Sequence, residues 1–254
     1  MPNAAHAADP VLLHAAGSLR SSLTEIADDF EKTSGLKVQA KFDASGLLKD
    51  EIAGGAPAEV FASANMEHPR ALAAEKISGS VVLFARNQMC VLARPGLAVT
   101  TTTLLDRMLD PTIKLGTSTP RADPSGDYAW DAFRKAETIK PGAFAALEKK
   151  ALKLVGFAGA PTAPPGRSVY ATLLNDGKAD LFLTYCTNAK DAQRENAAFQ
   201  MVRLPEELSV AADYGLTVMT RARAAAYQLA MFILAAEPQR VLAKYGFAAP
   251  GLPQ

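Results

Sequence analysis

The feature that most constrains this chain is its repeated change between short apolar strand patterns and amphipathic helix patterns. Residues 11–16 (VLLHAA) form an apolar run typical of a buried parallel strand, and residues 36–42 (LKVQAKF) alternate as a strand does. Between these strands, residues 18–34 repeat large apolar side chains at helical spacing until Gly35 ends the helix. Such alternation predicts an α/β fold with mainly parallel sheets.

The same alternation continues toward the C-terminus. The predicted strands are 11–16, 36–42, 59–64, 113–118, 179–187 and 214–220, and the predicted helices are 18–34, 45–52, 66–76, 102–109, 126–137, 141–152, 168–174 and 221–236. Residues 80–96 form one apolar run that is too long for a strand inside a small lobe, so we expect a strand that crosses between two lobes. Prolines and glycines make 156–167 a loop.

Composition argues against several classes of protein. With 49% hydrophobic and 21% charged residues in a chain of 254 residues, wholesale disorder is not expected. The net charge of +1 argues against a dedicated nucleic-acid surface, so we expect no nucleic-acid partner. No apolar run approaches the roughly 20 residues that a membrane-spanning helix needs, so we expect no membrane insertion.

Motifs for catalysis, nucleotides and metals are missing from the sequence. There is no G-x-S-x-G elbow, no glycine-rich phosphate loop, and no Cys/His/carboxylate spacing typical of zinc. The three histidines are His6, His14 and His68, and none follows a strand at the start of a helix. We predict that His14 is a core or lobe-edge residue. We also expect no catalytic residue, no bound free cation and no cofactor.

A strand–serine–helix junction recurs four times, at Ser18, Ser45, Ser125 and Ser168. A helix N-terminus presents unpaired N–H groups and a partial positive charge, which suit an anion, and serine adds a hydroxyl donor. Each serine taken alone is explained as a helix N-cap. Four junctions at the carboxyl ends of strands, divided between the two halves of the chain, favour an anion-binding site at that edge.

Several motifs carry a family resemblance that extends in order over nearly the whole chain. They are AAGSL, FDASGLL…EIAGGAPAEVFASA, LTYCTNA, DYGLTVMT and FILAAEPQRVLAKYGF. In these motifs the chain resembles the periplasmic molybdate-binding proteins of ABC importers. The resemblance implies a two-lobed periplasmic binding protein fold of type II, which clamps a tetrahedral oxyanion with neutral hydrogen bonds.

The resemblance also implies site residues, position by position. Ser18 and Ser45 match the two ligand serines of the first lobe, and Tyr185 matches the ligand tyrosine. Ser125 stands where the family usually offers an alanine backbone amide, a donor that could persist here with an added hydroxyl.

The family's remaining backbone donor falls at the start of the helix after the 156–167 loop. Arg167, Ser168 and Val169 all remain candidates for this donor.

The segment TSTPRADPSGDYAW departs from the family pattern. Its Asp-Pro-x-Gly core is similar to an archaeal tungstate/molybdate-binding branch, in which a carboxylate from this loop reaches the metal. Asp123 could take that role, although Thr184 stands in place of the branch's other carboxylate. Arg121 could instead add positive charge to the pocket. The simpler interpretation is that Arg121 and Asp123 are loop residues that pair with solvent or with each other.

The expected architecture has two lobes, each a mainly parallel sheet flanked by helices. Lobe one is expected to comprise 9–85 and 213–254, and lobe two 86–212. Two crossing segments near 84–90 and 205–214 would form the hinge.

The expected protein is a monomeric extracytoplasmic receptor without catalytic activity. It would close over molybdate or tungstate and dock on the permease of an ABC importer. A fully deprotonated oxyanion accepts every donor, whereas a protonated phosphate brings a hydrogen that finds no acceptor. Such a mismatch costs about 1–3 kcal/mol.

Other functions remain open on the sequence. Sulfate is a near alternative, and a small organic anion would use Arg121, Arg167 and Tyr170 in a larger pocket, so that its binding would survive loss of Ser18. Alternatives of a different class are an unrecognised hydrolase and the ligand-sensing domain of a transcription regulator. The missing base beside the four serines argues against the hydrolase.

Two further expectations concern the N-terminus and the cysteines. Residues 1–8 include Ala5-His6-Ala7 and are either the remnant of a secretory signal or a disordered tail. Cys90 and Cys186 could form one disulfide if the protein is secreted. Both lie in apolar segments, however, and we expect two separate buried thiols.

Overall fold

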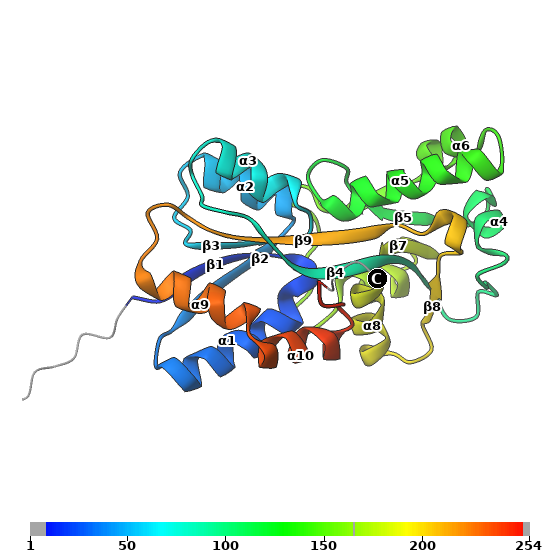
Figure 1. Ribbon diagram of the computed structural model, residues 1–254. Helices are drawn as coiled ribbons and strands as arrows, with labels where there is room; N and C mark the ends of the chain where they lie inside the picture. The colour runs from blue at the N-terminus through cyan, green and yellow to red at the C-terminus, as the bar shows by residue number, and fades with distance from the viewer. Residues whose placement is uncertain (1–8, 165, 251–254) are drawn as a thin grey trace, which may run out of the picture.

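A computed structural model of the protein describes residues 9–164 and 166–250. The expectation for residues 1–8 lies outside the described residues. The N-terminal part forms β1 (Val11–Ala16), α1 (Arg20–Ser34), β2 (Val38–Asp43), α2 (Ser45–Ala53), β3 (Val60–Ser63) and α3 (Glu67–Ala74). These elements and the two C-terminal helices α9 (Ala224–Leu234) and α10 (Ala236–Tyr245) lie together at one end of the molecule (Figure 1). We call this end the first lobe.

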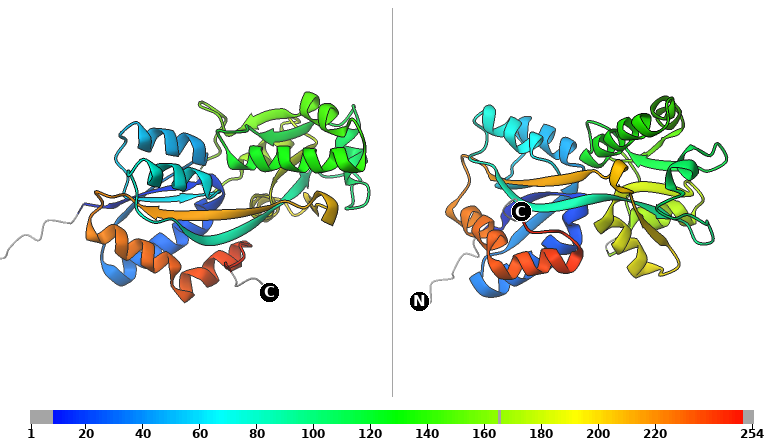
Figure 2. Two further views of the ribbon diagram at one scale, coloured as in Figure 1. Left: turned by 45° about the horizontal axis from the view of Figure 1, so that its top comes forward. Right: turned by 45° about the vertical axis from the view of Figure 1, so that its right-hand side comes forward.

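The opposite end, which we call the second lobe, is built from the middle of the chain. It contains α4 (Leu104–Leu109), β5 (Leu115–Ser118), α5 (Pro124–Ile139), α6 (Ala143–Lys150), β6 (Leu152–Val155), α7 (Val169–Asn175), β7 (Leu181–Tyr185), α8 (Cys186–Glu195) and β8 (Gln200–Arg203). Two long strands, β4 (Val82–Ala93) and β9 (Ala211–Val218), run between the lobes, as both views in Figure 2 show.

Sheet pairing separates the strands of the lobes from the crossing strands. Within the first lobe β1 pairs in parallel with β2 and β3, and within the second lobe β5 pairs in parallel with β6 and β7. The antiparallel pairs of strands all involve β4 or β9. Strand β9 pairs with β3 and β4, and strand β4 also pairs with β7 and β8. Parallel sheets in each lobe and the long crossing strand at 80–96 are confirmed. This is the type II periplasmic binding protein fold.

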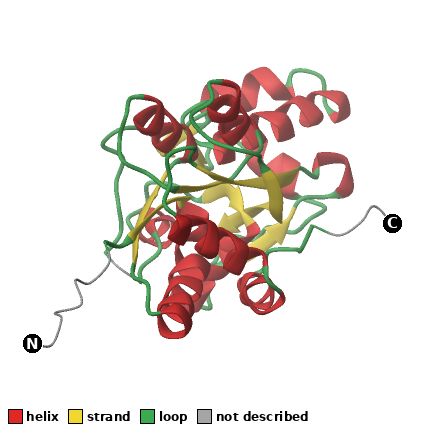
Figure 3. Ribbon diagram, turned by 60° about the vertical axis from the view of Figure 1, so that its left-hand side comes forward, coloured by secondary structure: helices red, strands yellow, loops and turns green. Residues whose placement is uncertain are grey.

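The helices cover both faces of this curled sheet (Figure 3). Helix α1 shows why the sequence folds in this way: Leu23, Ile26 and Phe30 are buried on one face, and Gly35 ends the helix with φ 74°. A residue with a side chain adopts this left-handed conformation at a cost, which glycine avoids. The apolar core is continuous from the first lobe, along the crossing strands, into the second lobe.

The C-terminal segment reinforces the crossing strand β4. After α10, Ala248 forms an antiparallel bridge with Arg86, with N–H···O distances of 2.8 and 2.9 Å. Phe247 packs edge-on against Tyr214 of β9, with ring centroids 5.3 Å apart. The lobe boundaries predicted at 85/86 and 212/213 fall inside β4 and β9, and they stay a prediction.

Four local predictions were wrong. Residues 152–155 form strand β6, which the prediction missed and whose first residue it placed in a helix, and 186–187 begin helix α8 rather than end a strand. The helix predicted over 221–236 begins at Ala224 and gives way at Ala235 to α10, which the prediction missed.

Candidate functional site

A cavity of about 820 Å³ lies between the lobes, where the strands of both lobes end. Of the predicted site residues, it is lined by Ser18, Ser45, Asp123, Arg167, Ser168, Val169 and Tyr185. Arg121 and Ser125 fall outside its described lining. Seven predicted residues from distant parts of the sequence therefore share one cavity.

The two serines of the first lobe are held by bonds to the rest of the protein. Ser45 is the first residue of α2, and its Oγ accepts a hydrogen bond from the backbone N–H of Ala64 at 3.0 Å. Ser18 lies in a short 3-10 turn before α1, and its Oγ is 2.9 Å from the Tyr214 Oη. Neither serine caps a helix, so the N-cap interpretation of these two junctions is wrong.

The third junction is capped by Asp123 rather than by Ser125. The Asp123 Oδ1 accepts the backbone N–H of Ser125 at 3.0 Å, in the first turn of α5. The backbone donor predicted at Ser125 is therefore already engaged. The Ser125 hydroxyl is buried and has no hydrogen-bond partner within the described part of the chain.

Asp123 itself opens onto the cavity. Burial raises the pKa of its carboxyl to about 6, and the hydrogen bond from Ser125 opposes this shift. A Cβ at Gly156, where φ is +77°, would stand 2.8 Å from the Asp123 Oδ2, so the absence of a side chain there leaves the carboxyl room. The cavity lining thus includes a carboxyl acceptor, and the expectation that a protonated oxyanion would find none stays a prediction.

The last junction agrees with its prediction. Ser168 is the N-cap of α7, and its Oγ accepts the N–H of Ala171 at 3.3 Å. The Ser168 N–H is taken by the carboxylate of Glu195, which also pairs with Arg167 at 2.7 Å. The Arg167 N–H donates to the Pro164 carbonyl at 3.0 Å. Among the three donor candidates at 167–169 this leaves Val169, the first helical residue, whose N–H has no partner within its helix.

Arg121 does not contribute its charge to this cavity. Its side chain is exposed, and its backbone N–H donates to the Asp127 Oδ1 at 2.8 Å. It adopts φ 70°, which is rare for a residue with a side chain. Within the described part of the chain, Arg121 and Asp123 do not form an ion pair with each other. Asp123 bonds instead to its own helix start.

Tyr185 combines burial with an unused hydroxyl. It ends β7, is 2% exposed, and lines the cavity. Its Oη has no hydrogen-bond partner among residues 9–164 and 166–250. Burial raises the pKa of this phenol well above its ordinary value, so the group stays protonated and remains a donor.

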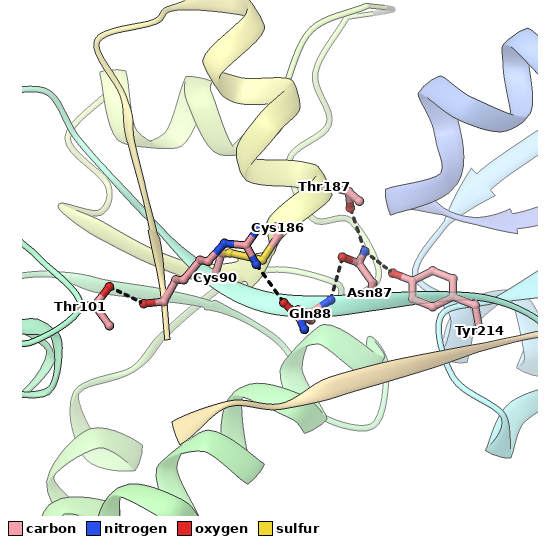
Figure 4. The surroundings of a disulfide bond; sticks show 8 residues. Asn87, Gln88, Cys90, Thr101, Cys186, Thr187 and Tyr214 are labelled. Atoms are coloured by element: carbon pink, nitrogen blue, oxygen red, sulfur yellow. Dashed lines mark hydrogen bonds between the residues drawn. A yellow bond between two sulfur atoms is a disulfide. The ribbon is translucent and has the colours of Figure 1, made fainter. Parts of the chain in front are cut away.

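A disulfide fixes the residue that follows Tyr185. Cys90 of β4 and Cys186 of α8 are bonded, with Cα atoms 4.8 Å apart (Figure 4). The expectation of two separate thiols is therefore wrong. The two cysteines lie 96 residues apart, and the antiparallel pairing of β4 with β7 brings them together by setting Cys90 opposite Thr184.

The charges around the cavity do not favour an anion by their sum. The lining contains three arginines (Arg20, Arg167 and Arg194) and four carboxylates (Asp43, Asp123, Asp191 and Glu195), which gives 3 − 4 = −1 if all are ionised. Arg167 pairs with Glu195 and Arg194 with Asp191. Recognition of an anion here would depend on hydroxyl and backbone donors rather than on excess positive charge.

The lobes touch on two sides of the cavity. The Gly46 N–H of α2 donates to the Ala122 carbonyl at 3.0 Å, and the Ser21 hydroxyl of α1 donates to the Asp191 carboxylate at 3.0 Å. A Cβ at Gly46 would lie 2.5 Å from the Arg121 carbonyl oxygen, so the close approach requires glycine. The two lobes are thus in direct contact beside the cavity.

The described residues offer little for other chemistry. Within 9–164 and 166–250, no group of three His, Cys, Asp or Glu side chains could hold a metal ion. His14 is 8% exposed and lies on β1 away from the cavity lining, as a core or edge residue should. None of the described helices has the length and apolar character needed to cross a membrane.

Sequence reasoning missed Tyr214 and Asn87, which connect Ser18 to the crossing strands. The motif DYGLTVMT contained Tyr214, but a tyrosine within an apolar strand predicts a core residue. No local signal relates it to Ser18, which lies 196 residues away.

The family follows from comparison with known proteins. A family model described as bacterial extracellular solute-binding protein matches residues 11–248. The chain therefore belongs to the bacterial extracellular solute-binding proteins, whose fold and role are those of binding proteins rather than enzymes. Membership places its function outside the cytoplasm.

Individual relatives confirm the resemblance to molybdate-binding proteins. An uncharacterized protein of Pasteurella multocida is 34% identical over 207 residues, which are 81% of this chain and 86% of that protein. The molybdate-binding protein ModA of Mycobacterium bovis is 28% identical over 259 residues, which cover 94% of this chain and 85% of that protein.

Solved structures share the fold. The periplasmic molybdate-binding protein of Azotobacter vinelandii matches with a TM-score of 0.75 at 18% identity, over 95% of this chain and 100% of that one. The sulfate-binding protein SubI of Mycobacterium tuberculosis H37Rv matches with a TM-score of 0.72 at 18% identity, over 95% and 88%.

Proposed function

We propose that this protein captures a tetrahedral oxyanion, with molybdate or tungstate preferred, between its two lobes. It delivers this ligand to the permease of an ABC importer. The ligand donors are the hydroxyls of Ser18, Ser45 and Tyr185 together with the backbone N–H of Val169. Support for molybdate comes from the ModA relatives, and the sulfate-binding neighbour makes sulfate the nearest competitor.

The observation that carries this proposal is the hydroxyl of Tyr185. A buried donor without a partner costs about 1–3 kcal/mol, and native proteins rarely keep one without a reason. Tyr185 is 2% exposed, lines the cavity, and lacks a partner in the part of the chain that the structure describes. A bound oxyanion would supply the missing acceptor.

Ser45 supports the same conclusion through the direction of its bond. A serine hydroxyl has one proton to donate and two lone pairs that accept. The Ala64 N–H occupies one lone pair of the Ser45 Oγ, and the hydroxyl proton remains available to a ligand. A dianion without protons accepts from such donors without needing a formal positive charge beside it.

A small organic anion is the second candidate, and the size of the cavity favours it. A water molecule takes about 30 Å³ of liquid volume, so a cavity of about 820 Å³ exceeds the needs of a four-oxygen ion. Aromatic side chains of Phe42, Phe157 and Tyr170 line this additional space. In such a ligand the oxyanion group would use the same donors, and the organic part would contact these rings.

A thermal-unfolding panel of molybdate, tungstate, sulfate, phosphate and several small carboxylates tests the proposal. A ligand at 100 times its dissociation constant stabilises the folded state by about 2.7 kcal/mol. The proposal expects clear shifts with molybdate and tungstate, and smaller ones with sulfate. Shifts with carboxylates alone would support the organic anion instead. No shift with any of these compounds at millimolar concentration would contradict both.

A further inference from the structure

The Ser18 hydroxyl stands at the end of a hydrogen-bond chain that begins on the crossing strand β4. The Gln88 N–H donates to the Asn87 Oδ1 at 2.9 Å. The Asn87 Nδ2 donates to the Thr187 Oγ1 at 2.9 Å and to the Tyr214 Oη at 3.1 Å. The Tyr214 Oη in turn lies 2.9 Å from the Ser18 Oγ. Figure 4 shows how Gln88, Asn87, Thr187 and Tyr214 meet.

The first member of this chain fixes the direction of the bonds that Asn87 makes. A backbone N–H can only donate, so the atom of Asn87 that faces Gln88 is the side-chain oxygen. The amide nitrogen therefore faces Tyr214, whose oxygen accepts from it. The bond with Asn87 does not use the Tyr214 hydroxyl proton, so this proton is available for donation to the Ser18 Oγ.

When Tyr214 donates this proton, Ser18 accepts it and keeps its own proton for the cavity that it lines. We propose that Tyr214 and Asn87 are positioning residues, which make the Ser18 hydroxyl a hydrogen-bond donor to a bound oxyanion. This inference rests on the proposed function. It assigns a role to two residues that do not themselves line the large cavity.

Burial makes the orientation effective. Tyr214 is 0% exposed and Asn87 is 4% exposed, so water competes little for their polar atoms. Hydrogen bonds in such surroundings are stronger than in water and support one another along a chain. Without the Tyr214 hydroxyl, the Ser18 hydroxyl would lose the partner that directs its proton toward the ligand.

The chain also draws on both crossing strands and on the second lobe. Asn87 lies on β4, Tyr214 on β9 and Thr187 on α8. The disulfide between Cys90 and Cys186 holds the start of α8 against β4, next to Thr187. The orientation of a first-lobe serine is therefore set by residues of the hinge rather than by its own lobe alone.

A double-mutant cycle tests the inference. Isothermal titration calorimetry with molybdate would compare the wild type, Ser18→Ala, Tyr214→Phe and the double variant. If Tyr214 acts through Ser18, Tyr214→Phe weakens molybdate binding about tenfold in the wild type and changes nothing further when Ser18 is already alanine. Losses that multiply in the double variant would overturn the inference.

Thr187→Val is the matched control. It removes the other bond of the Asn87 amide without touching the path from Asn87 to Ser18. We expect it to lower thermal stability and to leave molybdate affinity within about twofold of wild type. A loss of affinity equal to that of Tyr214→Phe would mean a general structural role, and would overturn the inference.

The two proposals fail in different ways. If wild type binds none of molybdate, tungstate, sulfate and phosphate, the proposed function fails and the inference falls with it. If wild type binds one of them and the cycle with that anion is additive, only the positioning role fails.

Discussion

The two walls of the cavity differ in how their hydroxyls are used. On the first-lobe wall, Ser45 bonds to Ala64 and Ser18 bonds to Tyr214. On the second-lobe wall, the Tyr185 hydroxyl is buried without a partner, as far as the described residues 9–164 and 166–250 extend. The Ser125 hydroxyl, which lies in the same lobe outside the cavity lining, is buried in the same unpartnered state. Both hydroxyls of the first wall have a partner within the protein, whereas the second lobe carries hydroxyls that have none.

This difference suggests a division of labour. A prearranged wall can bind an anion while the lobes are apart, and a wall with unmet donors gains most when closure brings an acceptor to it. The cost of an unmet buried donor, about 1–3 kcal/mol, also works against closure without ligand. The contrast therefore favours an empty protein that opens and a loaded protein that closes.

The largest expected effect comes from the disulfide between Cys90 and Cys186, which lies next to Tyr185 of the second wall. Replacing Cys90 and Cys186 together by alanine should lower the free energy of unfolding by about 2–5 kcal/mol. The bond ties the residue after Tyr185 to β4 across 96 residues of chain. Denaturant unfolding would measure the loss. Reduction should reproduce it in wild type and do nothing to the variant; an equally stable variant would contradict the prediction.

The next effect concerns the contact between the walls. Gly46→Ala places a Cβ 2.5 Å from the Arg121 carbonyl oxygen and 2.6 Å from that of Ala122. Because backbone oxygens cannot rotate away, the lobes should no longer close fully, and oxyanion affinity should fall by about 100-fold. Calorimetry measures the affinity, and small-angle scattering measures the closure.

Gly79→Ala is the control for Gly46→Ala. Its Cβ would meet nothing nearer than the Val218 carbonyl oxygen at 3.6 Å, an ordinary contact. It should bind as wild type does. Unchanged binding by Gly46→Ala as well would show that the α2 contact has no part in closure.

A smaller effect compares a partnered hydroxyl of the first wall, Ser45, with an unpartnered hydroxyl of the second lobe, Ser125. Ser45→Ala leaves the Ala64 N–H without its acceptor, and should lower the free energy of unfolding of the ligand-free protein by about 1–2 kcal/mol. Ser125→Ala removes a hydroxyl that has no partner within the described chain, and should change the free energy of unfolding by less than about 0.5 kcal/mol. Denaturant titrations of both variants compare the two hydroxyls, and equal losses of unfolding free energy would remove the distinction between partnered and unpartnered hydroxyls.

Much of the fold was accessible from the sequence because its signals are local. The apolar run 80–96 is too long for one lobe, and β4 does pair with strands of both. Strand β6 was missed because its four residues, LKLV, follow helix-forming lysines without a turn signal. Helix α8 begins directly after Tyr185 without a turn signal, so the strand predicted over 179–187 extended two residues into the helix.

The site was only partly predictable for the same reason. A serine after a strand indicates where a hydroxyl will stand, and Ser18, Ser45 and Ser168 do line one cavity. What each hydroxyl bonds to depends on residues far away in sequence, such as Tyr214 for Ser18. The pairing of Cys90 with Cys186 likewise follows from the register of β4 against β7, which local patterns do not contain.

The central claim is that the second wall waits for an oxyanion, and Tyr185→Phe tests it most directly. Calorimetric titration of molybdate into wild type and Tyr185→Phe would be combined with unfolding of each protein without ligand. Tyr128→Phe is the control, since Tyr128 packs against Tyr185 with centroids 6.2 Å apart but lies outside the described cavity lining. We predict that Tyr185→Phe binds molybdate at least tenfold more weakly, while its ligand-free stability equals or exceeds that of wild type. Unchanged affinity, or a loss of ligand-free stability, would contradict the claim.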